Sequence, residues 1–149
     1  MAIKDLVKPE LVFAKQALSS KKRVLEFIAQ AVGDRLHCEA DEVYDALLSR
    51  EKLGSTGVGN GIGIPHCRLD KAHQATMVVI SLADTIDFDS IDRKPVDLIF
   101  ALIVPPEQCD SHLQTLAAIA ELAQSTDKLS QLRAAGDNAA LLARFQSSL

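Results

Sequence analysis

The sequence is poor in aromatic residues and has no excess of positive charge. It contains no tryptophan, one tyrosine and five phenylalanines, so aromatic side chains make up 4% of its 149 residues. Asp and Glu outnumber Lys and Arg by 20 to 16, which gives a formal net charge of −4. The one basic cluster, Lys21-Lys22-Arg23, opens a helical pattern and is interpreted as a solvated helix face. A nucleic-acid surface needs basic side chains and stacking rings, so we expect no nucleic-acid partner.

Cysteine is also scarce, and long apolar runs are missing. The three cysteines, Cys38, Cys67 and Cys109, form no Cys-x-x-Cys pair, a pattern typical of reduced thiols in the cytoplasm. No apolar run approaches the roughly 20 residues that a membrane-spanning helix needs. The start, Met-Ala-Ile-Lys-Asp, has no export pattern. We therefore expect a cytoplasmic protein without direct membrane insertion.

Hydrophobic residues, in contrast, make up 48% of the chain. This content fills a core, and no linker or repeat divides the chain, so we expect one domain over residues 1–149. Five helices are expected from their capping residues and apolar spacing. The first begins after an N-cap at Ser19 or Ser20 and stops at Gly33, and the second covers 39–51. The third follows a cap at Asp110 or Ser111, the fourth covers 127–135, and the last begins at Asp137. Strands are expected around 62–64, over 77–82 and over Val96–Val104, whereas 11–18 fits a strand or a helix. This order favours an α/β sandwich with a mixed sheet and helices on two faces.

The densest feature is a glycine run between Gly54 and Gly63 that leads into Pro65 and His66. It is not a P-loop, because Asn60 stands where that motif requires lysine, and it matches no Gly-x-Gly-x-x-Gly turn, so no nucleotide cofactor is expected. Four of its glycines alternate: Gly57, Gly59, Gly61 and Gly63. In an extended segment this spacing leaves one face bare, to which a partner can come close. A flexible surface loop is the alternative interpretation.

Two of the four histidines are candidates for chemistry. Histidine changes charge near neutral pH and can act as a nucleophile, and His66 follows Pro65, whose ring stiffens the local chain. His112 is expected in the first turn of a helix, where free N–H groups and the helix dipole attract anions. The two histidines could together hold a phosphoryl group. We interpret the others, His37 and His73, as surface residues.

Residues around the glycine run could support such an anion. Arg50 and Arg68 flank the run and could supply positive charge, although either could be an ordinary surface cation. Ser55 and Thr56 could donate hydroxyl hydrogen bonds to phosphate or cap a turn. Cys67 is adjacent to His66, so in an extended chain their side chains point to opposite faces. A zinc site built from His66, Cys67 and His112 would lack any recognisable ligand spacing. We expect no metal.

The chain resembles the enzyme IIA domains of the bacterial phosphoenolpyruvate-dependent phosphotransferase system (PTS), of the fructose/mannitol type (EIIA type 2) and most of all its nitrogen-regulatory branch. The resemblance rests on three segments: Ser-Arg-Glu-Lys-Leu-Gly through Ile-Pro-His over 49–66, Phe-Asp-Ser-Ile-Asp through Val-Pro-Pro over 88–106, and Ser-His-Leu-Gln-Thr-Leu over 111–116. It implies an α/β fold with a five-stranded mixed sheet flanked by helices. It also implies that His66 accepts a phosphoryl group, supported by His112 and Arg50. No cofactor is implied.

The resemblance further implies the partners. An HPr-like phosphocarrier protein would be the donor, and the chain would regulate targets such as potassium transport or sensor-kinase components by phosphorylation-dependent binding. One alternative is a sugar-specific IIA component that passes phosphate to a IIB domain of a permease. Others are a binding module indifferent to its phosphorylation state, and a thiol or metal enzyme that uses Cys67. The chain departs from its relatives at Gly63, and at Cys67 and Arg68, which stand where glycine and lysine are more usual and could tune carrier docking.

Overall fold

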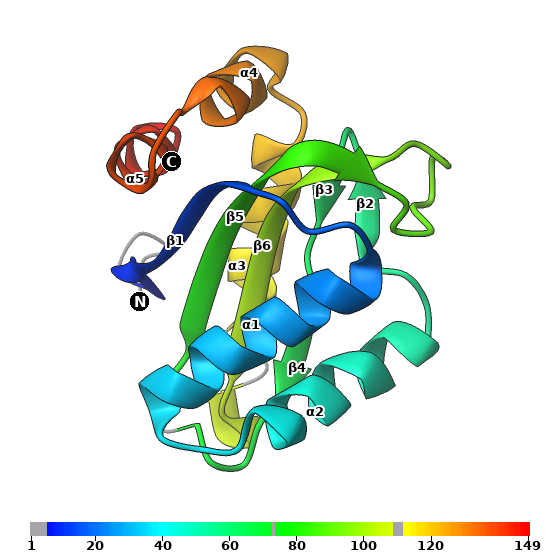
Figure 1. Cartoon of the computed structure of the whole chain (residues 1–149), viewed down its shortest axis with the longest axis vertical. Coiled ribbons are helices and arrows are strands. Elements are labelled where there is room, and N and C mark those ends of the chain that lie inside the picture. The colour runs from blue at the N-terminus through cyan, green and yellow to red at the C-terminus, as the bar shows by residue number, and fades with distance from the viewer. Residues whose placement is uncertain (1–5, 73, 109–111) are drawn as a thin grey trace.

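The structure is a computed structural model that describes residues 6–72, 74–108 and 112–149 (Figure 1). Its strands are β1 (Val7–Gln16), β2 (Gly57–Gly59), β3 (Ile62–Gly63), β4 (His66–Arg68), β5 (Thr76–Ile86) and β6 (Val96–Val104). Its helices are α1 (Lys21–Leu36), α2 (Ala40–Lys52), α3 (Leu113–Leu122), α4 (Thr126–Ala134) and α5 (Asn138–Ser147). A short 3-10 helix covers Pro106–Gln108.

The strands form one mixed sheet in the order β1-β5-β6-β3-β2, with β4 also paired to β6. β1 runs parallel to β5, β5 antiparallel to β6, and both β3 and β4 run parallel to β6. The sheet has six strands, so the expected count of five was wrong. The extra strand arises because one extended segment is interrupted at Ile64-Pro65, where proline has no N–H to donate to the ladder. The register on β6 is the same on both sides of this break, since Gly63 pairs with Ile99 and His66 with Leu102.

Helices cover both faces of the sheet, as predicted. Figure 1 shows α1 and α2 in front of the sheet and α3 behind it. The apolar run of β6 explains why both faces are covered: Leu98, Phe100 and Leu102 belong to a core shared with α3, α4 and α5. The alternate residues Ile99, Ala101 and Ile103 belong to the core under α1 and α2. A strand that is buried on both faces needs apolar side chains at successive positions, and the nearly continuous apolar run of β6 shows this pattern.

The helix ends agree with the capping signals in most places. Ser20 accepts a hydrogen bond from the backbone N–H of Arg23, and Asp137 one from that of Ala140. Gly33 was wrong as a stop, because α1 continues to Leu36. A Cβ at Gly33 would lie 3.0 Å from the carbonyl oxygen of Cys38 and 3.3 Å from Ala40, so the glycine permits the close packing of α1 on the start of α2. The predicted caps Asp110 and Ser111, like His73 and Cys109, lie outside the described residues.

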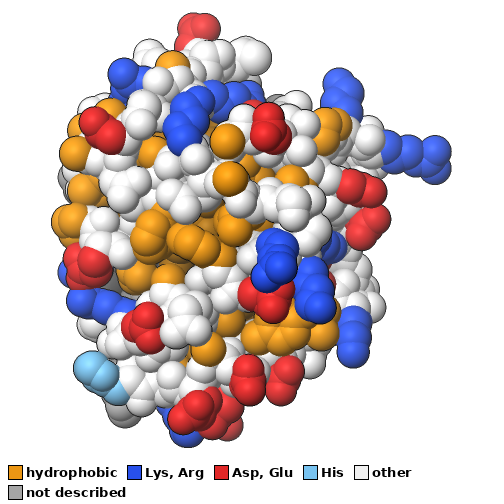
Figure 2. All heavy atoms as spheres, in the orientation of Figure 1, with side chains coloured by type: hydrophobic (Ala, Val, Ile, Leu, Met, Phe, Trp, Pro, Cys, Tyr) orange, Lys and Arg blue, Asp and Glu red, His pale blue; other side chains and the backbone are white. Residues whose placement is uncertain are grey.

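The ambiguous segment 11–18 belongs mainly to β1, an edge strand. The last residues of β1 leave the regular hydrogen-bond pattern of the sheet. Lys15 has a left-handed φ of 55° and donates its N–H to the Ser81 hydroxyl. The N–H of Ala14 donates to the side chain of Asn138 at the start of α5. Between β1 and α1, apolar side chains reach the surface (Figure 2). There the Phe13 and Phe27 rings pack edge to face at 4.9 Å.

No helix in the described part of the chain is long and apolar enough to cross a membrane.

Candidate functional site

The alternating glycines form a hairpin rather than one extended face. β2 and β3 are antiparallel, and Asn60 and Gly61 join them with φ angles of 57° and 81°, as a primed turn requires. The bare positions are filled from within the protein. A Cβ at Gly57 would lie 2.4 Å from the Ser90 hydroxyl, and one at Gly63 would lie 3.1 Å from the Phe88 ring. The predicted approach of a partner to this glycine face is therefore not seen, because the chain's own loop occupies it.

The hairpin is followed by Pro65 and then by His66, the first residue of β4. The N–H of Ile64 donates to the Thr56 carbonyl, and the N–H of Leu102 donates to the Pro65 carbonyl at 2.9 Å, so the segment is tied on both sides. Nδ1 of the half-buried His66 ring lies 2.7 Å from the Ile64 carbonyl oxygen. A carbonyl can only accept, so Nδ1 carries a proton, and in the neutral ring the lone pair is therefore on Nε2.

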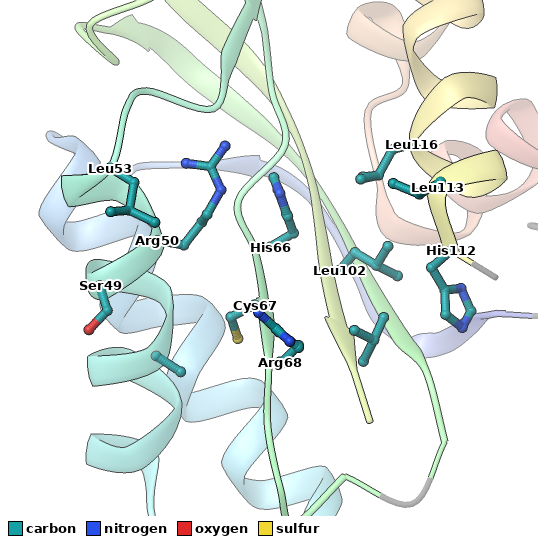
Figure 3. Close-up of a pocket in the computed structure, with 12 residues that line it drawn as sticks. Ser49, Arg50, Leu53, His66, Cys67, Arg68, Leu102, His112, Leu113 and Leu116 are labelled. Carbon is teal, nitrogen blue, oxygen red and sulfur yellow. The ribbon is translucent and has the colours of Figure 1, made fainter. Parts of the chain in front are cut away.

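His66 faces a pocket of about 640 Å³ (Figure 3). α2 and β4 form one wall, and β6 and α3 the other. The lining residues are Ala46, Ser49, Arg50, Leu53, His66, Cys67, Arg68, Leu102, Val104, His112, Leu113 and Leu116. In a chain with a net charge of −4, the described residues of this lining include two arginines and no carboxylate. The pocket therefore suits an anion.

The structure brings Arg50 and Arg68 to the same pocket as His66. Arg50 lies in the last turn of α2, and its Nη1 donates to the Gly54 carbonyl at 2.8 Å. Figure 3 shows its guanidinium pointing to the same level of the pocket as the His66 ring. Arg68 follows His66 by two residues on β4 and lies lower in the same view. Both cations thus line the pocket of the imidazole from adjacent elements, Arg50 at the level of the ring and Arg68 below it.

His112 lines the pocket too, but it is not hydrogen-bonded to His66. It is the N-cap of α3 and is 7% exposed, and its Nδ1 is buried without a partner among the described residues. Figure 3 shows the two rings on opposite sides of Leu102 and turned away from each other. Burial lowers the pKa of His112, so the ring is neutral at neutral pH. His112 therefore does not support the His66 ring by direct contact in this arrangement, and its support of the phosphoryl group stays a prediction.

The hydroxyls of Ser55 and Thr56 have partners elsewhere, and neither residue lines the pocket. Ser55 Oγ donates to the Phe88 carbonyl at 2.6 Å and accepts from the N–H of Gly57. The buried Thr56 hydroxyl donates to the carboxylate of Glu51. Both residues fasten the start of the hairpin, so their predicted role at the phosphate is not supported by their position.

Cys67 is unsuited to nucleophilic chemistry. Its side chain belongs to the core under α1 and α2, and burial raises the pKa of its thiol to about 12. The thiolate, which is the reactive form, is therefore not populated at neutral pH. In the described part of the chain, no three His, Cys, Asp or Glu side chains gather where they could hold a metal ion.

Two leucines on the pocket rim were missed by the sequence analysis. Leu53 is 84% exposed at the end of α2, and Leu113 is 63% exposed at the start of α3. Both line the pocket mouth with apolar surface. For Leu53 the available signal was its place beyond the apolar stripe of its helix, whereas Leu113 continues the apolar pattern of α3 and was expected to be buried, so its exposure comes from the structure alone.

Comparison with known proteins defines the class. The family described as "Phosphoenolpyruvate-dependent sugar phosphotransferase system, EIIA 2" matches residues 5–148, and the chain belongs to this family. A nitrogen regulatory protein of Klebsiella oxytoca is 40% identical over 136 residues, which are 91% of this chain and 84% of the relative. One of Pseudomonas aeruginosa is 46% identical over 117 residues, 78% of this chain and 76% of the relative.

Two further similarities place the chain within the family. The crystal structure of nitrogen regulatory protein IIA-Ntr from Neisseria meningitidis superimposes with a TM-score of 0.90 at 31% identity, covering 95% of this chain and 97% of that one. A PTS fructose-specific EIIA component of Haloferax volcanii is 38% identical over 111 residues, 74% of this chain and 72% of the relative. The recognised resemblance and the α/β fold are thereby confirmed.

Proposed function

We propose that this chain is a phosphocarrier of the PTS that accepts a phosphoryl group on Nε2 of His66 from an HPr-like protein. The observation that carries the proposal is the 2.7 Å contact between Nδ1 and the Ile64 carbonyl. It fixes the neutral tautomer and leaves the Nε2 lone pair free in an anion-binding pocket. Proteins of this family carry phosphoryl groups between PTS components.

The transfer needs no cofactor and no net proton movement. The Nε2 lone pair of His66 forms the new N–P bond as the P–N bond to the carrier's imidazole breaks, and that electron pair returns to the carrier's nitrogen. The proton on Nδ1 stays on His66 and keeps its hydrogen bond to Ile64. Because the transition state is largely dissociative, positioning and charge stabilisation are the protein's main contributions.

The pocket supplies these contributions through two polar residues and two leucines. Arg50 is held by its bond to Gly54, so it offers a positioned cation to the equatorial oxygens. His112 lines the pocket as a neutral ring, which can offer its ring N–H to a phosphoryl oxygen. Leu53 and Leu113 give the carrier an apolar rim on which to exclude water.

The acceptor atom can be determined directly. We expect that protein labelled with ¹⁵N-histidine and phosphorylated by its phosphocarrier will show phosphorus coupling at Nε2 of His66, because Nδ1 is occupied by its proton and the Ile64 carbonyl. Two-dimensional NMR of the imidazole nitrogens measures this coupling. Coupling at Nδ1 of His66, or at any other histidine, would contradict the proposed tautomer and acceptor.

Phosphorylation would also regulate partner binding. A phosphoryl group adds nearly two negative charges to a pocket whose charged lining residues are Arg50 and Arg68. We expect this reversal of local charge to change which targets bind, whether they belong to potassium transport, to sensor kinases or to another class. Quantitative binding of a purified target to the phosphorylated and unphosphorylated forms measures the change. Equal affinities would favour the module that is indifferent to phosphorylation.

A sugar-specific role is the second candidate, favoured by the similarity to a fructose-specific EIIA component. In that case the phosphoryl group on His66 would pass to a IIB domain. Rapid loss of label from the phosphoprotein on mixing with a purified fructose-type IIB domain would support it, whereas label that stays on His66 would support the regulatory role.

A further inference from the structure

Arg68 is a charged residue at the site to which the motif assigns no role. It is exposed and lines the pocket of His66, two residues farther along β4. Side chains two apart on a strand point to the same face, with α-carbons about 6.6 Å apart, a gap that the long arginine side chain can span. Within the described chain its guanidinium has no hydrogen bond or ion pair, whereas Arg50 already donates to Gly54. Arg68 therefore has its full donor set available.

The backbone of β4 adds a second donor at the same place. The Pro65 carbonyl and the N–H of Leu69 both bond to β6, through Leu102 and Val104 respectively. Because backbone groups on a strand alternate in direction, the N–H groups of the intervening His66 and Arg68 point away from β6. No acceptor among the described residues takes either of them. β4 thus has main-chain donors without a described partner along its edge away from β6, next to the residue that would carry the group.

We propose that Arg68 binds the phosphoryl group after it has reached His66, through its guanidinium and with help from the main-chain N–H beside it. This proposal rests on the proposed function and adds a residue to it. Arg50 acts from α2 on the group in transit, and Arg68 acts from β4 on the product. A guanidinium binds two phosphoryl oxygens at once, whereas an ammonium acts as a point charge. Arg68 accordingly shifts the equilibrium of phosphoryl transfer between the carrier and His66 toward phosphorylated His66.

The test is the equilibrium of transfer, because an equilibrium between the separate proteins does not depend on how they dock. Wild type, Arg68→Ala and Arg68→Lys are each mixed with phosphorylated carrier, and the fractions of both phosphoproteins are measured when they no longer change. We expect the equilibrium constant for His66 phosphorylation to fall about tenfold in Arg68→Ala, the loss of one exposed charge-assisted contact. Arg68→Lys should fall less, because it keeps the charge.

Arg23→Ala is the matched control, because Arg23 is an exposed arginine on α1 away from the pocket. It should keep the wild-type equilibrium. A wild-type equilibrium constant in Arg68→Ala would show that Arg68 is an ordinary surface cation, and the proposed function would still stand. Failure of the wild-type protein to be phosphorylated on His66 would instead overturn the proposed function.

Discussion

Replacing His66 with alanine will abolish phosphorylation of this protein by its carrier. Among the described residues that line the pocket, His66 is the only histidine whose tautomer is fixed by a hydrogen bond. Neither described neighbour replaces it, because the Cys67 thiol is protonated and Nδ1 of His112 is buried. Labelled phosphate, passed from phosphoenolpyruvate through the purified carrier system, measures the loss. Because His66 is half-buried on a short strand, circular dichroism should show an unchanged fold.

Two other histidines provide graded controls. His37 lies at the left-handed end of α1, with a φ of 56°, so His37→Asn is the appropriate change, since asparagine tolerates this conformation. It should be labelled like the wild type. His112→Ala should be labelled more slowly but to completion, because His112 lines the pocket without contacting the His66 ring. Equal labelling of His66→Ala and wild type would refute the assignment of the acceptor.

Replacing Glu51 with alanine will destabilise the fold by about 3 kcal/mol, as expected when one partner of a buried ion pair is removed. The carboxylate of Glu51 is buried at the end of α2, pairs with Lys21 Nζ at 2.6 Å, and accepts from the backbone N–H and the hydroxyl of Thr56. Without it, Thr56 keeps two buried donors without an acceptor. Denaturant titration gives the change in unfolding free energy, and the melting temperature should fall by about 10 °C.

Glu42→Ala is the matched control for this prediction. Glu42 is also on α2 and also pairs with a lysine, Lys71, at 2.9 Å, but both side chains are about half exposed. Solvent screens such a pair, so its loss should change stability little. If Glu42→Ala were as destabilising as Glu51→Ala, loss of α2 helix charge rather than burial would explain both results.

The sequence predicted those elements whose signals are local. The strand Val96–Val104 and the caps at Ser20 and Asp137 were found because an apolar run and a capping side chain act within a few residues. The strand β1 stayed ambiguous because its pattern satisfies either period, and only pairing with β5 decides it. Strand pairing joins residues that are far apart in the chain, so a local pattern does not predict the partner.

The hairpin was missed although its signal was present. Asn60-Gly61 is the dipeptide most typical of a two-residue hairpin turn, but the regular spacing of the glycines was interpreted as one extended face. The roles of Ser55 and Thr56 depended on the partners that folding brings to them, Phe88 and Glu51. For Ser55 that partner lies in a distant loop. Conversely, Arg50 and Arg68 were predicted near His66 because the chain between them is short.

The irregular end of β1 affects how the protein meets other molecules. An open strand edge is a template for adding a further strand, and proteins with such edges tend to polymerise. Here the left-handed Lys15 turns the chain out of line, and Asn138 takes up the amide of Ala14, so an incoming strand cannot continue the ladder at that point. This device disfavours association of two molecules by strand addition at the end of β1, so growth into extended assemblies along that edge is blocked there.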